Sequence, residues 1–161
     1  MDSTQLRTVA FLRTLTDDEL AAFAQLLTMR NFAAREQIIV EGAPVHALYL
    51  VMGGVVHIRR LAQKREMLLG RLGVGGFFGE INLFDPGVAT ASIYAMKPTQ
   101  VATADHASIR EFMENNPTPG YKIVSGMMTE MARRLRQTSA RLVNVAYWSS
   151  AEASVPAAEK A

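Results

Sequence analysis

The most informative segment of this chain is GVGGFFGEINLF, which occupies residues 73–84. Its first part is rich in glycine, and glycine permits the positive φ angles that tight turns need. Its second part, Glu80-Ile81-Asn82-Leu83-Phe84, favours a short helix whose first N–H groups have no partner inside the helix. Such a junction suits an anion such as phosphate, and Glu80 suits ligand hydroxyls. The same pattern also fits a plain β-turn in which the helix dipole favours Glu80.

Short β-rich runs separated by turn residues lie on both sides of this segment. The runs occupy residues 37–40, 47–51, 55–58 and 67–72, and glycine or proline stands between several of them. Runs of this length with turn signals between them are typical of an antiparallel barrel, sandwich or roll. We therefore predict an antiparallel β-structure over residues 29–105.

Helical patterns flank the predicted β-structure. Thr16-Asp17-Asp18-Glu19 has the pattern of a capping box, and it opens an amphipathic run that predicts a helix at about 16–28. A short helix is predicted at 108–115. A long final helix is predicted over 119–147, because Pro119 suits a first helical turn.

The predicted final helix carries a narrow seam at heptad spacing. Its members are Val124, Met128, Met131, Leu135, Thr138, Leu142 and Val145, and all except Thr138 are apolar. A helix packed on its own domain and a two-helix contact between subunits both fit this seam. The length of the helix and the narrow stripe favour the contact between subunits, so we predict a homodimer through the C-terminal helix.

Composition limits the class of protein. The chain has 161 residues, of which 49% are hydrophobic and 20% charged, so it can bury a core. We predict one domain over 1–148 and a flexible tail over 149–161. The net charge of +2 is too small to indicate a nucleic-acid partner. With no cysteine, no apolar run of membrane-spanning length and no secretory signal pattern, we expect a cytoplasmic protein that does not bind membranes.

The sequence shows no pattern typical of catalysis or of metal binding. His46, His57 and His106 are scattered without the spacing of metal ligands. No nucleophile-elbow pattern is present, and Asp17-Asp18 begins a helix instead of forming a carboxylate pair for acid–base chemistry. We therefore predict no enzyme activity, no catalytic residue and no bound metal.

Separated motifs in the correct order resemble those of the cyclic nucleotide-binding domain family. Phe78-Gly79-Glu80-Ile81-Asn82-Leu83, followed by Ala89-Thr90-Ala91-Ser92-Ile93, resembles its phosphate-binding cassette. Residues 49–56 resemble its β-roll turn, and Gly42 resembles an earlier glycine. Residues 131–139 resemble the dimerising C-helix of the family's bacterial catabolite activator branch. The resemblance spans about 11–148.

The resemblance implies a fold and a role for each matching residue. The fold is α+β: an antiparallel β-roll (a jelly-roll-like double-stranded β-helix) of about eight strands with an N-terminal helix and a long C-terminal dimerisation helix. Gly79 would offer its N–H to the cyclic phosphate, Glu80 would hold the ribose 2′-hydroxyl, and Thr90 would lie beside the phosphate. Arg134 would reach toward the ligand, while Thr138 and Ser139 would read the adenine edge from the two subunits. The remaining predicted site residues are Phe78, Ile81, Ala89 and Ala91.

Thr138 has a second interpretation. A polar residue inside an apolar seam also fixes the register of two helices, and this account stays open beside the nucleobase contact.

Ala89 departs from the family's cassette, which has an arginine at this position. That arginine forms a charge-assisted fork on the cyclic phosphate. A charge-assisted hydrogen bond contributes about 1.5–3 kcal/mol, so its loss weakens binding by about ten- to several-hundredfold. No other Lys or Arg lies between Leu72 and Met96. We therefore expect cyclic nucleotide binding of the usual kind to be weak or absent.

The C-terminus is a second departure from the transcription-factor branch. In that branch the C-helix leads into a helix-turn-helix domain, whereas thirteen residues follow Trp148 here. That length is too short for a three-helix DNA reader, so we expect no direct DNA binding.

Three hypotheses follow. The chain is a stand-alone regulatory or sensor domain whose degenerate pocket binds another small anion or nothing. Alternatively, it is a functional cAMP sensor, or a dimeric adaptor with a vestigial pocket. cAMP and another small anionic ligand are the candidate ligands, and no cofactor is assigned.

Overall fold

The computed structural model describes residues 3–63 and 65–153. The chain forms two compact units, Met1–Gly126 and Met127–Ala161, and the described part of the second unit is the continuation of the last helix. The elements follow in the order α1 (Ser3–Leu6), a 3-10 turn (Ala10–Leu12), α2 (Asp17–Ala24), β1 (Thr28–Phe32), β2 (Gln37–Ile39), β3 (Ala47–Gly53), β4 (Val56–Ala62), β5 (Arg65–Leu72), β6 (Phe77–Phe78), α3 (Glu80–Phe84), β7 (Ser92–Ala95), β8 (Thr99–Asp105), α4 (His106–Asn115) and α5 (Pro117–Ala153).

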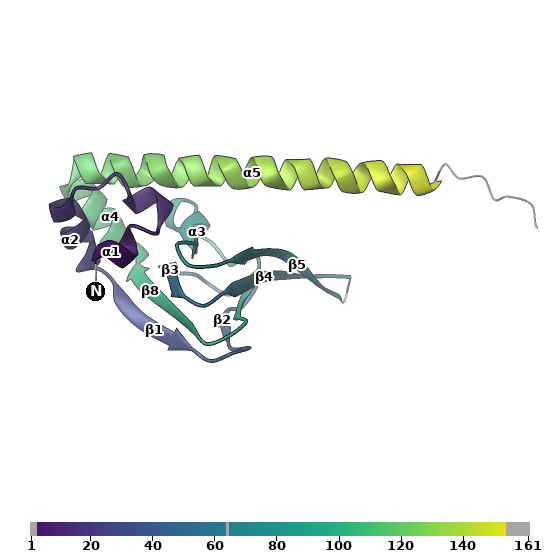
Figure 1. Cartoon of the computed structure of the whole chain (residues 1–161), viewed down its shortest axis with the longest axis horizontal. Helices are drawn as coiled ribbons and strands as arrows, with labels where there is room; N and C mark the ends of the chain where they lie inside the picture. Colours follow the sequence, from purple (N-terminus) through teal and green to yellow (C-terminus); the bar gives the residue numbers. More distant parts are fainter. Residues whose placement is uncertain (1–2, 64, 154–161) are drawn as a thin grey trace, which may run out of the picture. The chain divides into compact units, whose positions relative to one another are not determined.

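The strands of the first unit form two antiparallel four-stranded sheets (Figure 1). Their orders are β1-β8-β3-β6 and β2-β7-β4-β5, so each sheet joins strands that are distant in the sequence. Together with the long C-terminal helix, these sheets confirm the predicted α+β fold with a jelly-roll-like β-roll.

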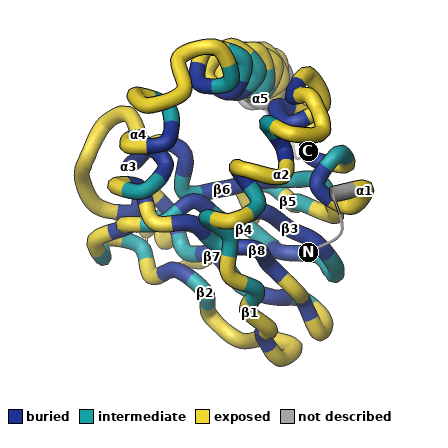
Figure 2. Tube along the Cα trace, turned by 90° about the vertical axis from the view of Figure 1, so that its left-hand side faces the viewer, coloured by how far each residue is buried: buried dark blue, intermediate teal, exposed yellow. Residues whose placement is uncertain are grey.

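The core of the first unit lies along β3 and β8, which pair over nearly their whole length. Figure 2 shows the buried residues gathered on these strands. A buried cluster joins the two sheets and includes Val51, Val56 and Val101, each with no exposed surface. Burial of such side chains contributes about 1.5–3 kcal/mol each. Phe78 and Ala89 belong to the same cluster, so two predicted site residues are part of the core.

A chain of aromatic contacts connects the strand before Gly79 to the helices. The ring of Phe77 in β6 meets that of Phe11 edge to face, with centroids 4.9 Å apart. Phe11 also meets Phe23 of α2 at 6.5 Å, and Phe23 meets Phe112 of α4 at 5.7 Å. Edge-to-face pairs of this kind stabilise a core beyond simple burial. The strand that leads into the cassette, β6, is therefore connected to α2 and α4 by packed aromatic rings.

Several helix boundaries differ from those predicted. α2 ends at Ala24, before position 28, because Thr28 begins β1 and pairs with Thr103 of β8. α4 begins at His106, before position 108, because the Asp105 carboxylate accepts the N–H of Ala107 and caps the helix.

The last helix begins at Pro117, which fits a first helical turn because proline lacks the N–H that would have no partner there. It continues to Ala153, so residues 149–153 of the predicted tail are helical. Residues 154–161 lie outside the described part of the chain. The predicted division at residue 148 stays a prediction.

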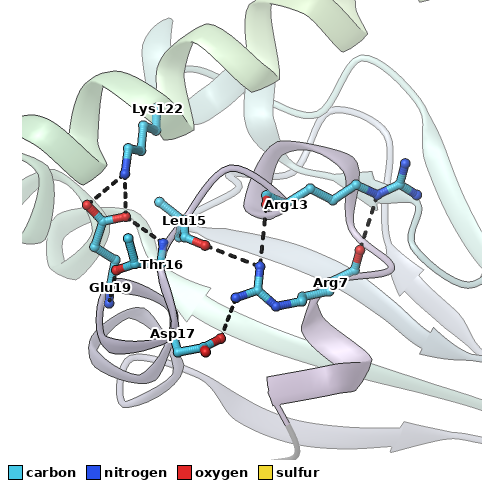
Figure 3. A network of polar contacts seen from close by, with 7 residues as sticks. All are labelled: Arg7, Arg13, Leu15, Thr16, Asp17, Glu19 and Lys122. Atoms are coloured by element: carbon cyan, nitrogen blue, oxygen red, sulfur yellow. Dashed lines mark hydrogen bonds and ion pairs between the residues drawn. The ribbon is translucent and has the colours of Figure 1, made fainter.

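Figure 3 shows a polar network that ties α2 to the first turns of α5. The predicted capping box is present: the Thr16 hydroxyl accepts the N–H of Glu19, and the Glu19 carboxylate accepts the N–H of Thr16. Lys122 of α5 donates to both oxygens of the same carboxylate, at 2.9 and 2.7 Å. These contacts, led by the hydrogen bond from Lys122, hold the pKa of Glu19 below its usual value of 4.5.

We expect Lys122→Met to lower the free energy of unfolding at neutral pH. Because the pKa of Glu19 is lowered in the folded protein, the stability it contributes is complete above about pH 4.5 and is lost as the pH falls further. The difference between Lys122→Met and the native protein should therefore shrink below that pH. Urea unfolding at pH 7 and pH 3.5 measures it, with exposed Lys97→Met as the control. An unchanged difference at the lower pH would contradict the role of this ion pair.

Candidate ligand-binding site

Gly79 forms the junction between β6 and α3. It is the N-cap residue of α3 and has a left-handed backbone, with φ 84° and ψ 2°. A Cβ atom at this position would collide with the carbonyl oxygen of Ala47 and lie 3.2 Å from Cδ2 of Tyr49. Glycine is required here for both reasons. The turn predicted from the glycine-rich segment is therefore present, and β3 packs directly against it.

The residues on either side of Gly79 are buried. Phe78 is paired with Tyr49 of β3, and their rings stack with centroids 4.8 Å apart. Glu80, the first residue of α3, is only 6% exposed, whereas Ile81 points out and is 42% exposed. A carboxylate can accept hydrogen bonds from ligand hydroxyls, and this role of Glu80 stays a prediction.

Ala89 lies against the loop that contains Gly42. Its N–H donates to the carbonyl of Ala43 at 2.8 Å, and its own carbonyl accepts the N–H of Gly42 at 2.9 Å. Ala89 and Ala91 are buried, while Thr90 between them is exposed. The position that carries an arginine in the resembled cassette is therefore occupied by a methyl group in the buried core.

An arginine of β4 reaches the same loop but is already paired. Arg60 contacts the carboxylate of Glu41 at 3.3 Å, and that carboxylate also accepts the N–H of Leu61 at 3.0 Å. Glu41 directly precedes Gly42. Arg60 would have to leave Glu41 before it contacted a ligand phosphate.

His106 lies beside Gly79, which the sequence did not predict. The first residue of α4, it is 5% exposed, and its Nε2 lies 3.0 Å from the carbonyl oxygen of Gly79. A lone histidine in the sequence has no pattern that indicates such a contact. Arg110, one helical turn later, also faces α3. The spacing of four residues between His106 and Arg110, which places both on one helix face, was the available signal in the sequence. Within the described residues, no three His, Asp or Glu side chains gather as a metal site would require.

Burial is the main cause that lowers the pKa of His106 below its usual 6.5. Hydrogen bonding to the carbonyl of Gly79 raises this pKa, and the positive charge of Arg110 lowers it. The carbonyl of Ala47 and the charge of Asp105 have smaller raising effects. The imidazole is therefore neutral at physiological pH.

We expect this histidine to make the protein less stable in mild acid. The unfolded chain takes up a proton near pH 6.5, whereas the folded chain resists it, so the stabilisation is complete above that pH and is lost as the pH falls. Urea unfolding at pH 7.5 and 5.5 should show a smaller loss for His106→Gln than for the native protein. Exposed His46→Gln is the matched control. Equal losses for His106→Gln and native protein would refute this explanation.

The other three predicted residues lie in the second unit. Arg134 contacts the carboxylate of Glu130 at 3.2 Å, and Arg133 binds the same carboxylate. Thr138 and Ser139 are exposed. The structure thus brings residues 78–81 and 89–91 together within the first unit, and it assigns the three helix residues to a separate unit.

The second unit exposes part of the predicted seam. Met128, Leu135 and Leu142 are 62%, 68% and 65% exposed and follow one another at intervals of seven residues. The side chain of Val145 lies outside the described part. Within the described residues, no helix is both long and apolar enough to span a membrane.

Comparison with known proteins gives consistent results. A family model for the cyclic nucleotide-binding domain matches residues 29–116. A CRP-like cAMP-activated global transcriptional regulator from Mycobacterium tuberculosis is 30% identical over 129 residues, which are 80% of this chain and 56% of that protein. The chain therefore spans about half the length of this curated relative.

Two further matches differ in how much of the other protein they cover. Glutaminase 2 from Bradyrhizobium diazoefficiens is 28% identical over 88% of this chain, but the match covers only 22% of that enzyme. The crystal structure of a cyclic nucleotide-binding domain from Methylobacillus flagellatus superposes with a TM-score of 0.81, covering 88% of this chain and 84% of that one at 19% identity. The second match concerns the fold alone.

Proposed function

This chain belongs to the cyclic nucleotide-binding domain family, and from that premise we propose that it is a regulatory or sensor domain with a degenerate cassette. The cassette keeps the left-handed Gly79 and the buried Glu80, but it binds cyclic nucleotides weakly or not at all. Its function is to respond to another small anion or to act without a ligand, in the cytoplasm and without catalysis or direct DNA contact of its own.

The observation that carries this proposal is the burial of Ala89 and the pairing of its backbone. Its side chain is a methyl group within the buried cluster, and its N–H and carbonyl are bound to the 42–43 loop. A cyclic phosphate placed beside it would depend on neutral N–H donors and the Thr90 hydroxyl. An anion that leaves water without a cationic partner is poorly compensated.

Calorimetric titration of the purified protein with cAMP and cGMP tests the proposal. We expect no binding in the micromolar range for either nucleotide. Glu80→Gln is the companion variant, because it removes the charge assigned to the ribose contact and keeps the size of the side chain. Micromolar or tighter binding that Glu80→Gln weakens would overturn the proposal and support the functional cAMP sensor.

We further propose that the protein acts as a homodimer through α5. The support is the exposed stripe of Met128, Leu135 and Leu142, whose spacing matches one edge of a two-helix seam. Large apolar side chains that repeat along one line of a helix are costly to leave in water. A second copy of the same helix would cover them.

The same stripe favours a second candidate function. If the cassette binds no ligand, the dimer helix would present the protein to a partner as an adaptor. This alternative predicts that function survives disruption of the cassette by Glu80→Gln, whereas a sensor would lose its response.

A further inference from the structure

α4 lies against the cassette and contacts both ends of α3. At the start of α3, His106 Nε2 lies 3.0 Å from the carbonyl oxygen of Gly79, the residue that caps α3. The backbone N–H of His106 donates to the carbonyl of His46 at 2.8 Å, beside the Ala47 carbonyl that confines Gly79. Because a carbonyl oxygen only accepts hydrogen bonds, the His106 ring donates its Nε2–H to Gly79, and His106 is itself fixed to the start of β3.

At the other end of α3, Arg110 binds the last carbonyl groups of the helix. Its Nε donates to the carbonyl of Leu83 at 3.1 Å, and its terminal nitrogen donates to Leu83 at 2.5 Å and to Asn82 at 3.5 Å. The last carbonyls of a helix have no partner inside the helix, and a cation there is favourable. His106 and Arg110 are four residues apart on α4 and so share one face of it.

The contact of Arg110 extends to the second half of the cassette. Arg110 approaches the backbone carbonyl of Asn82. The side-chain amide of the same Asn82 donates to the backbone carbonyl of Val88 at 3.4 Å. Val88 directly precedes Ala89. One face of α4 is thus connected to Gly79 through His106 and to the 88–89 segment through Arg110 and Asn82.

We propose that His106 and Arg110 are positioning residues, which fix the two ends of α3 and so place Gly79, Glu80 and Ala89 for ligand binding. α3 has only five residues, and a helix of that length is not stable without tertiary contacts. The proposal deepens the proposed function and rests on it for the binding role, whereas the effect on α3 itself can be measured without any ligand.

Hydrogen exchange of the free protein tests the effect on α3. In Arg110→Met, we expect amide exchange over residues 81–85, including the Asp85 N–H that bonds to Ile81, to accelerate about ten- to hundredfold. Exchange over 101–104 in β8 should stay within twofold of the native rate. Arg65→Met, a change at an exposed arginine of β5, is the control. Native-like exchange over 81–85 in Arg110→Met would overturn the assignment of Arg110.

The role of His106 is tested by a pair of variants. His106→Phe keeps a buried ring but removes the donor, and we expect faster exchange over 80–82. His106→Gln can still donate to the Gly79 carbonyl, so it should restore slow exchange at pH 7.5. Equal exchange in the two variants would show that the ring acts by packing alone. If either Arg110→Met or His106→Phe fails to fold, Arg110→Lys and His106→Asn provide the milder changes for the same measurement.

The binding role is tested on the Ala89→Arg background, with cAMP as the probe. Arg110→Met should weaken cAMP binding there by about tenfold or more. Arg65→Met, the control variant, is expected to leave both the fold and the exchange over 81–85 unchanged. Unchanged affinity together with faster α3 exchange would overturn the binding role and leave a structural one. If Ala89→Arg itself binds no nucleotide, the adaptor is favoured over a degenerate but intact cassette, and the exchange experiment still decides whether α4 fixes α3.

Discussion

An arginine at position 89 is expected to raise the affinity for cAMP by about ten- to several-hundredfold. A guanidinium binds a phosphate through a charge-assisted fork, and a charge-assisted hydrogen bond contributes about 1.5–3 kcal/mol, which corresponds to this range of affinity. The frame around the position is complete: Gly79 has the left-handed turn, Glu80 is buried, and Ala89 is held by the 42–43 loop. If the cassette is degenerate as proposed, the cation at position 89 is the component that it lacks.

The new arginine also has a cost in the absence of ligand. Ala89 lies in the buried cluster, so a guanidinium there is removed from water, which is costly. We expect Ala89→Arg to unfold at a lower temperature than the native protein, and cAMP to raise its Tm more than that of the native protein. Binding that is specific for the variant then appears in both calorimetry and thermal unfolding.

Val88→Arg is the matched control for this experiment. It adds the same charge at the neighbouring residue, whose side chain is 56% exposed, and so it tests attraction by charge alone. Binding by Ala89→Arg and not by Val88→Arg would support a degenerate but intact cassette. Binding by both variants would contradict a specific fork at position 89. Silence from native protein and Ala89→Arg alike would favour the adaptor.

Leu135→Glu is expected to convert a dimer into a monomer. Leu135 is 68% exposed in the isolated chain and stands in the middle of the stripe. Each dimer would contain two substituted positions, and each loses about 1.5–3 kcal/mol of apolar burial before the cost of burying the carboxylate. The dissociation constant should therefore rise by about a hundredfold to ten-thousandfold.

Sedimentation velocity measures this change directly. The native protein should sediment as twice the 17.7 kDa chain, and Leu135→Glu as a single chain. Gln137→Glu adds the same charge to the same helix at an exposed position off the stripe, and it should remain dimeric. Met131→Glu should behave like Leu135→Glu. An unchanged sedimentation coefficient in both Leu135→Glu and Met131→Glu would refute the two-helix seam.

Sequence reasoning predicted the elements that depend on short-range interactions. The capping box at Thr16 was correct because its two hydrogen bonds join residues three apart. The turn at Gly79 was correct because a positive φ angle favours glycine and leaves it visible in the sequence. The end of α2 was wrong by four residues, because β1 begins at Thr28, which pairs with a strand more than seventy residues later.

By itself, the sequence predicted an antiparallel β-structure and the heptad seam of the last helix, because both are visible in residue types at fixed short spacings. Its resemblance to the cyclic nucleotide-binding domain family implied the β-roll, the cassette and the missing arginine at Ala89. Only the tertiary structure decided that Ala89 is held by the 42–43 loop, that Arg60 is paired with Glu41, and that α4 contacts both ends of α3. The reason is physical: apart from the ion pair between Arg60 and Glu41, these contacts end on backbone carbonyls and N–H groups, which nearly every residue has, so no residue type marks the partner until the chain has folded.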